Sequence, residues 1–115
     1  MKLKNEVVDI HDYSLEAHEF AAYPEAGTGS VHEGMYLALG LVGEAGECSE
    51  KIKKLYRDGR FVHEDFVKEL GDVFWYLSQL CAWAEVTPSQ VLTLNLNKLR
   101  DRKNRNKIKG EGDNR

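Results

Sequence analysis

Two long segments of this chain, Glu33 to Arg57 and His63 to Ala84, repeat apolar residues at helical spacing. In each segment the apolar residues fall on one stripe of a helical wheel, which predicts two amphipathic helices. Asp58-Gly59 ends the first helix and the second begins almost at once, so we expect antiparallel neighbours. The stripes consist of Leu37, Leu41, Cys48 and Leu55 in the first segment, and of Phe66, Leu70, Val73, Leu77 and Leu80 in the second.

Four carboxylates lie in or beside these stripes, as two pairs whose members are three residues apart and therefore share a helix face. Glu44 falls inside the first stripe with Glu47 on its flank, whereas Glu69, Asp72 and Tyr76 follow one edge of the second. Carboxylates gathered at a half-buried site repel one another and must take up protons or bind cations. Oxygen ligands favour Mg²⁺, with Mn²⁺ as the second choice. The sequence therefore predicts a metal site between the two helices, formed by Glu44, Glu47, Glu69 and Asp72; the alternative is four solvated carboxylates.

Two more helices complete an all-α prediction, because no stretch alternates at period two for long enough to form a sheet. One runs from His11 to Tyr23 and is ended by Pro24, and the other opens at Thr87-Pro88 in cap-then-first-turn order. We expect a single domain over 1–115, with a core at about 11–102 and a basic, flexible tail at 103–115. The first helix is expected to face inward with Tyr13, Ala17, Phe20 and Ala21; the fourth with Val91, Leu94 or Leu96, and Leu99.

Composition favours a soluble cytoplasmic protein. The 115 residues are 42% hydrophobic, no apolar run approaches the length of a membrane span, and residues 1–6 lack the apolar stretch of a signal peptide. Cys48 and Cys81 have no metal or redox spacing and are interpreted as reduced core residues. The basic run 98–109 has no interleaved aromatic residue in a chain of net charge −3, so phosphate attraction or a subunit contact is favoured over nucleic-acid binding.

Gly40, Gly43 and Gly46 recur every third residue inside the first long segment, at a cost of about 1 kcal/mol each relative to alanine. The spacing indicates that another helix or a ligand approaches the backbone near Glu44 and Glu47, the alternative being a tolerant helix. Further along the flank of Glu47, Lys51 and Lys54 are candidate phosphate ligands. They could instead be ordinary lysines at the basic end of a helix.

The runs 37–47 (LALGLVGEAGE) and 68–77 (KELGDVFWYL) closely resemble the all-α nucleoside triphosphate pyrophosphohydrolases of the MazG-like group, whose ExxE, spacer, ExxD pattern is met in full. The resemblance covers roughly residues 11 to 115, including Asn97-Lys98-Leu99, and the tail GEGDNR looks like that of the small stand-alone members of bacteria and phages. It implies a four-helix bundle that hydrolyses a nucleoside triphosphate between its α and β phosphates, giving the monophosphate and pyrophosphate.

The resemblance also implies roles for individual residues. Mg²⁺ held by the four carboxylates would bridge the protein and its acidic substrate, and Glu47 or Glu44 would orient or deprotonate the attacking water. Glu47 is the first choice because it lies nearer the edge of the stripe. Tyr76 would touch the sugar or base, unless it is a core tyrosine, and Asn97 and Lys98 would contact substrate from the fourth helix. Members of the group form homodimers or tetramers, so helix residues of a second subunit are expected to complete the base pocket.

Two alternatives stay open. Phosphoribosyl-ATP pyrophosphohydrolase of histidine biosynthesis uses a similar acidic site on a similar helical fold. A non-catalytic helical metal-binding or regulatory protein, such as a ferritin-like carboxylate bundle, would carry Glu-x-x-His pairs that this chain lacks. The preferred base and sugar and the biological role are not readable from the sequence.

Overall fold

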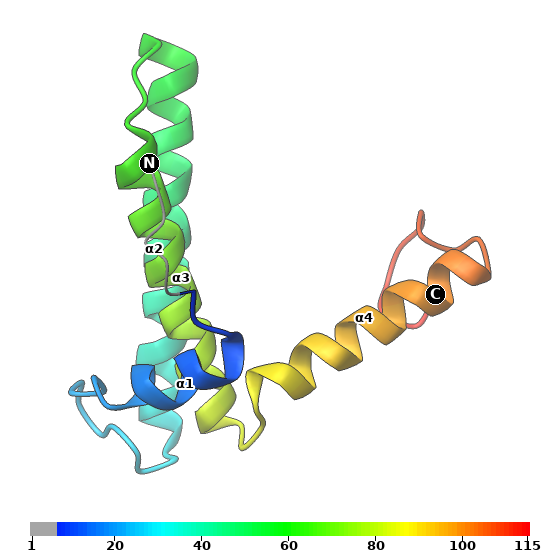
Figure 1. Cartoon of the computed structure of the whole chain (residues 1–115), viewed down its shortest axis with the longest axis horizontal. Coiled ribbons are helices and arrows are strands. Elements are labelled where there is room, and N and C mark those ends of the chain that lie inside the picture. Colours follow the sequence, from blue (N-terminus) through cyan, green and yellow to red (C-terminus); the bar gives the residue numbers. More distant parts are fainter. Residues whose placement is uncertain (1–6) are drawn as a thin grey trace.

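A long antiparallel hairpin of two helices, α2 (Val31–Asp58) and α3 (His63–Trp83), forms the centre of the molecule (Figure 1). The computed structural model describes residues 7–115, so residues 1–6, on which the expectation of no signal peptide rests, lie outside it. The other elements are α1 (Ile10–His18) and α4 (Pro88–Asn104). No strand occurs among the described residues, which confirms the all-α prediction.

Local capping interactions set the helix ends. The hydroxyl of Ser30 accepts a hydrogen bond from the Glu33 N–H (3.1 Å) at the start of α2. At its end Gly59 adopts the left-handed conformation (φ 68°) and donates its N–H to Leu55 O at 2.9 Å. Thr87 and Gln90 form a capping box at the start of α4, with Pro88 in the first turn. The predicted limits of α2 and α3 are therefore correct to within two residues.

The prediction for the first helix is wrong at its C-terminal end. The helix stops at His18 instead of Tyr23, and residues 19–20 continue as a turn. Helical conformation is disfavoured for the residue before a proline, which here is Tyr23. The ring of Tyr23 also stacks on that of Tyr36, with centroids 5.1 Å apart, and this contact keeps Tyr23 out of the helix. Phe20, expected to face inward, is 69% exposed as a result. Ala17 is buried as predicted, and its carbonyl accepts the indole N–H of Trp75 at 3.1 Å.

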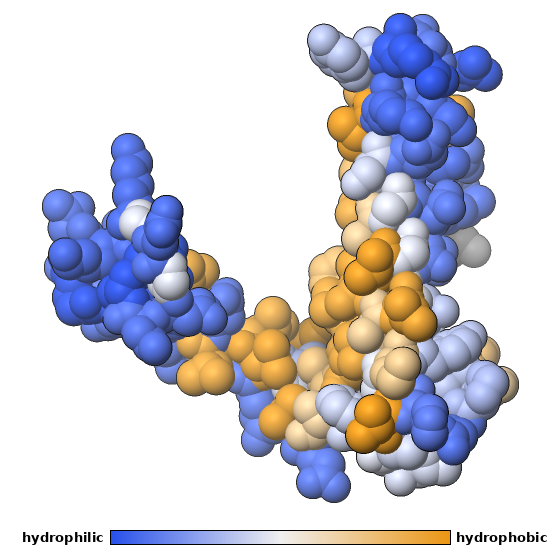
Figure 2. Space-filling model, turned by 180° about the vertical axis from the view of Figure 1, so that it is seen from behind, coloured by the Kyte–Doolittle hydropathy of each residue, from blue (hydrophilic) through white to orange (hydrophobic). Residues whose placement is uncertain are grey.

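One chain buries few apolar side chains. Among the described residues, Ala17 and Leu37 are the buried hydrophobic ones, while Leu70 and Leu77 of the predicted α3 stripe are 40% and 42% exposed. Helix α4 starts beside α1 and α3 and then runs away from the hairpin (Figure 1). Figure 2 shows apolar side chains gathered on one face of the hairpin and continuing onto the first part of α4. No helix of residues 7–115 has the length and apolar character needed to cross a bilayer.

Candidate functional site

Three of the four predicted carboxylates converge where α2 packs on α3. Glu44 of α2 and Glu69 and Asp72 of α3 each place an oxygen within 4.8 Å of the other two. Glu44 and Glu69 are half-buried and Asp72 is exposed, so the cluster lies at the surface of the hairpin. Glu47, one turn beyond Glu44, is exposed and is not a member of this group of three. We call Glu44, Glu69 and Asp72 the acidic cluster.

The acidic cluster has a strongly negative environment. Burial, followed by the charge of Asp72, contact with Glu69 and the charge of Glu47, raises the pKa of Glu44 above its ordinary value. Within residues 7–115, no lysine or arginine forms an ion pair with these carboxylates. Repulsion of this kind is relieved by a proton or by a bound cation, and oxygen ligands are the ones that hard divalent cations prefer.

Tyr76 lies beside the acidic cluster, as predicted for a residue one turn beyond Asp72. A Cβ at Gly40 would overlap its ring, which confirms close approach as the reason for this glycine. Added Cβ atoms at Gly43 and Gly46 would meet nothing within 4 Å, so this chain gives no packing reason for them. Burial, then the neighbouring Tyr36 and the charge of Glu44, raises the pKa of the Tyr76 hydroxyl. The ring of Trp75 packs edge-on against that of Tyr76, with centroids 5.1 Å apart.

Sequence reasoning missed a second acidic position, Glu33. Its side chain is 3% exposed and accepts hydrogen bonds from the Tyr23 hydroxyl (2.7 Å) and from the N–H groups of Gly27 (2.7 Å) and Gly29 (2.9 Å). These bonds, that of Tyr23 first, hold the pKa of Glu33 below its ordinary value. Glu33 therefore fastens the loop between α1 and α2. The spacing Ser30-x-x-Glu33, typical of a capping box, was the available signal.

Gln79 was also missed. It is 1% exposed, and its amide nitrogen lies 3.3 Å from His18 Nδ1 and donates to the Tyr23 hydroxyl at 3.5 Å. Together with Glu33 it lines a cavity of about 270 Å³ beside the α1–α2 loop. The α1 end of the hairpin is thus rich in aromatic rings and hydrogen-bonding groups. No apolar periodicity marks a buried glutamine, so the sequence offered no signal for it.

Lys51 and Lys54 lie further along α2 than the acidic cluster, near the end of the hairpin where α2 turns into α3. Both line a cavity of about 230 Å³ that also receives side chains of the α2–α3 connection. Lys51 is half-buried and Lys54 is exposed.

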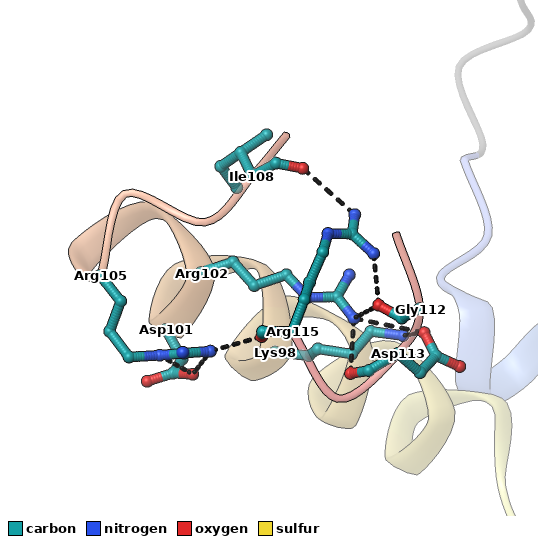
Figure 3. A network of polar contacts seen from close by, with 8 residues as sticks. All are labelled: Lys98, Asp101, Arg102, Arg105, Ile108, Gly112, Asp113 and Arg115. Atoms are coloured by element: carbon teal, nitrogen blue, oxygen red, sulfur yellow. Dashed lines mark hydrogen bonds and ion pairs between the residues drawn. The ribbon is translucent and has the colours of Figure 1, made fainter. Parts of the chain in front are cut away.

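The structure does not bring Asn97 and Lys98 to the acidic cluster within one chain. Both lie on α4, which makes no contact with α2 in the described residues and points away from the hairpin (Figure 1). The Lys98 ammonium pairs with the Asp113 carboxylate at 3.0 Å (Figure 3). Arg102, 4% exposed, donates to the Asp113 carbonyl at 2.7 Å, so the tail folds back onto α4. Any contact of Lys98 with a substrate at the acidic cluster would have to come from another copy of the chain.

The chain is similar to known proteins over most of its length. Residues 33–106 match the family model described as "MazG nucleotide pyrophosphohydrolase domain". The "Gene 37 protein" of Mycobacterium phage L5 is 47% identical over 114 residues, which cover 94% of this chain and 98% of that protein. No solved structure matches the chain.

Proposed function

Because the chain belongs to the MazG nucleotide pyrophosphohydrolase domain family, we propose that it is a metal-dependent nucleoside triphosphate pyrophosphohydrolase. Its substrates would be ribo- or deoxyribonucleoside triphosphates. A water oxygen would form a bond to the α phosphorus while the bond from that phosphorus to the bridging oxygen breaks, and pyrophosphate would leave with the bonding electrons. The observation that carries the proposal is the convergence of Glu44, Glu69 and Asp72 within the matched residues.

The acidic cluster fits a divalent cation, Mg²⁺ or Mn²⁺. Three carboxylates with oxygens within 4.8 Å of one another, and no basic side chain of residues 7–115 paired with them, form an all-oxygen donor set. When bound, the cation would supply charge neutralisation for the phosphates and lower the pKa of a coordinated water. Glu47, one turn away on α2, would either add a fourth carboxylate or accept the proton of the attacking water.

Other residues of the hairpin would hold the substrate. Lys51 and Lys54 would contact phosphate oxygens as point charges, and Tyr76, on the opposite side of the acidic cluster along the hairpin, would contact the sugar or base. The direction of α3 supports this division, because Tyr76 follows Asp72 toward the α1 end whereas the two lysines lie toward the α2–α3 connection.

We further propose that residues 1–115 act as one domain within a homo-oligomer, a dimer or a tetramer. The support is the apolar surface that one chain leaves open on α3 and α4, with Leu94 and Leu96 74% and 46% exposed. Asn97 and Lys98 lie on the same projecting helix. The α4 of a second copy would therefore both cover apolar surface and bring these two residues to the site.

The test is pyrophosphate release from a panel of ribo- and deoxyribonucleoside triphosphates and phosphoribosyl-ATP, with Mg²⁺ or Mn²⁺. Product identity is determined together with the rate. We expect monophosphate and pyrophosphate from nucleoside triphosphates, with the reaction lost in Glu47→Gln and Asp72→Asn. Preferential cleavage of phosphoribosyl-ATP would show that this compound, and not a nucleoside triphosphate, is the substrate. No turnover of any substrate by a folded oligomer would overturn the proposal in favour of a metal-binding protein.

A further inference from the structure

The end of the hairpin where α2 turns into α3 carries a cavity of about 230 Å³ with a basic lining. Figure 2 shows this end as the most hydrophilic part of the hairpin. Basic side chains outnumber carboxylates four to two in its wall. The lining consists of Lys51, Lys54, Arg57, Asp58, Arg60, Phe61, Val62 and Asp65. We call it the tip cavity.

Most of the positive charge in the tip cavity is not neutralised internally. Arg57 is committed to Asp58 through two hydrogen bonds of 2.8 Å, which removes one cation and one carboxylate from the balance. Lys51, Lys54 and Arg60 form no ion pair with any carboxylate of residues 7–115. Asp65, the other carboxylate of the lining, lies in the first turn of α3, where the helix dipole stabilises a carboxylate. The cavity therefore has an excess of positive charge.

The wall of the tip cavity is fixed by the short connection. Gly59 closes α2 in the left-handed conformation, and the ring of Phe61 packs on that of Phe66 with centroids 5.4 Å apart. Arg60 lies between these two anchored residues, so its backbone position is defined on both sides. A defined basic cavity can hold a compact anion at lower entropic cost than mobile surface lysines.

The tip cavity lies beyond the acidic cluster, in the direction of the α2–α3 connection. Lys51 follows Glu44 by seven residues, which places it on the same face about 10 Å further along the helix axis. Side chains on a helix lean toward its N-terminus, so those of Lys51 and Lys54 lean back toward the cluster. A polyphosphate bound at the acidic cluster and extended in this direction would point its terminal phosphates toward these lysines.

We propose that the tip cavity binds the pyrophosphate leaving group, with Arg60 joining Lys51 and Lys54 as a phosphate ligand. This inference rests on the proposed function and extends it: the substrate lies with its nucleoside toward α1 and its terminal phosphates toward the α2–α3 connection. Pyrophosphate, a compact anion of high charge, is complementary to the excess positive charge of the cavity.

Calorimetric titration with inorganic pyrophosphate in metal-free buffer tests the site. Removing one charge-assisted contact is expected to weaken binding about tenfold in Arg60→Gln, and more in the double variant Lys54→Gln/Arg60→Gln. Lys53→Gln is the matched control, because Lys53 carries the same charge on α2 but pairs with Glu50 at 2.9 Å and does not line the cavity. Asp72→Asn is expected to retain binding, since the cavity and the acidic cluster are separate. Equal affinities of Arg60→Gln and Lys53→Gln would overturn the inference.

Kinetics separate this inference from the proposed function. In an active enzyme, Arg60→Gln is expected to raise the inhibition constant of pyrophosphate about tenfold, whereas Lys53→Gln leaves that constant unchanged. Hydrolysis with product inhibition unaffected in Arg60→Gln would overturn the cavity assignment alone. Absence of hydrolysis, with calorimetric binding still dependent on Arg60, would overturn the proposed function and leave the cavity as a pyrophosphate site.

Discussion

Two glutamates of α2, about three turns apart, have pKa values shifted in opposite directions by their surroundings. Glu33, at the start of the helix, is buried and accepts three hydrogen bonds, and these lower its pKa. Glu44, near the middle, is half-buried, and burial together with its acidic neighbours Asp72, Glu69 and Glu47 raises its pKa. Burial alone therefore does not identify a functional carboxylate. A buried glutamate that accepts hydrogen bonds stabilises the fold. A half-buried glutamate whose neighbours are other carboxylates favours the binding of a proton or a cation.

Activity should show the largest difference between the two regions. Glu69→Gln removes one carboxylate of the acidic cluster and is expected to lower kcat/KM for a nucleoside triphosphate about 1,000-fold, because a metal bound there would supply several kcal/mol of stabilisation. Glu33→Gln, assayed at a temperature where it is folded, should stay within about threefold of the wild type. Steady-state kinetics on both variants make the comparison, and equal losses would show that Glu33 belongs to the catalytic site.

Stability should show the reverse pattern. Glu33→Gln is expected to lower the free energy of unfolding by about 3 kcal/mol, because an amide cannot accept all three hydrogen bonds that the buried carboxylate accepts. Glu44→Gln, in metal-free buffer, should cause no loss, because it removes repulsion within the acidic cluster. Urea denaturation at a fixed protein concentration measures both values. A larger loss in Glu44→Gln would contradict the assignment of roles.

Metal binding should stabilise one region only. At a free Mg²⁺ or Mn²⁺ concentration of about 100 times its dissociation constant, the wild type should gain about 2.7 kcal/mol. Asp72→Asn should lose this gain, and Glu33→Gln should keep it, because Glu33 is not a member of the acidic cluster. Thermal unfolding with and without metal, with Ca²⁺ as a further cation, is the measurement. An equal gain in Asp72→Asn would place the metal elsewhere.

Gly40 lies between the two glutamates and tests how closely α2 and α3 are fitted there. Gly40→Ala gains about 1 kcal/mol of helix propensity, but the methyl group overlaps the Tyr76 ring, which costs about 1–3 kcal/mol. A net loss of about 1 kcal/mol is therefore expected. Gly43→Ala is the matched control, because its methyl group meets nothing within 4 Å and should give a net gain. Denaturant unfolding measures the free energy of unfolding of both variants. An increase in both would show that the Tyr76 ring moves freely to make room for the methyl group.

The smallest expected difference between Glu33 and Glu44 is in how the free energy of unfolding depends on pH. The pKa of Glu33 is lowered by folding, so its stabilisation is complete above the ordinary value of 4.5 and is lost as the pH falls through the folded value. The pKa of Glu44 is raised, so its contribution is complete below 4.5 and is lost as the pH rises through the folded value. In metal-free buffer, the deficit of Glu33→Gln relative to the wild type should therefore shrink on acidification. The advantage of Glu44→Gln should appear on alkalinisation, and parallel pH profiles for the two variants would contradict the comparison.

The sequence predicted the hairpin well because its limits are set by local chemistry. Ser30 and Gly59 cap α2 through bonds to residues within four positions, and Thr87 caps α4 in the same way. The end of α1 could not be predicted in this way. It depends on Tyr23, whose stacking on Tyr36 and bond to Glu33 are tertiary contacts that override helix periodicity.

The part of the candidate site that depends on residue spacing within one helix was predictable from the sequence. Pairs three residues apart put Glu44, Glu69 and Asp72 on facing surfaces, and the packing of α2 on α3 brought them together. The different exposure of Glu47 depends on the rotation of α2 against α3, which spacing does not give. The tip cavity depends on the path of residues 59–62, and the burial of Gln79 on the docking of α1; neither leaves a periodic signal.

The short α2–α3 connection has a consequence for the order of events during synthesis. Residues 59–62 are all that separates the two helices, whereas the bond between Trp75 and Ala17 joins positions 58 residues apart. Contacts that are local in sequence form early, because they close small loops. We expect the acidic cluster to assemble as soon as α3 has emerged from the ribosome, before α4 has emerged. The carboxylates would then meet the metal ions of the cell in a nascent chain, ahead of any encounter with a second copy.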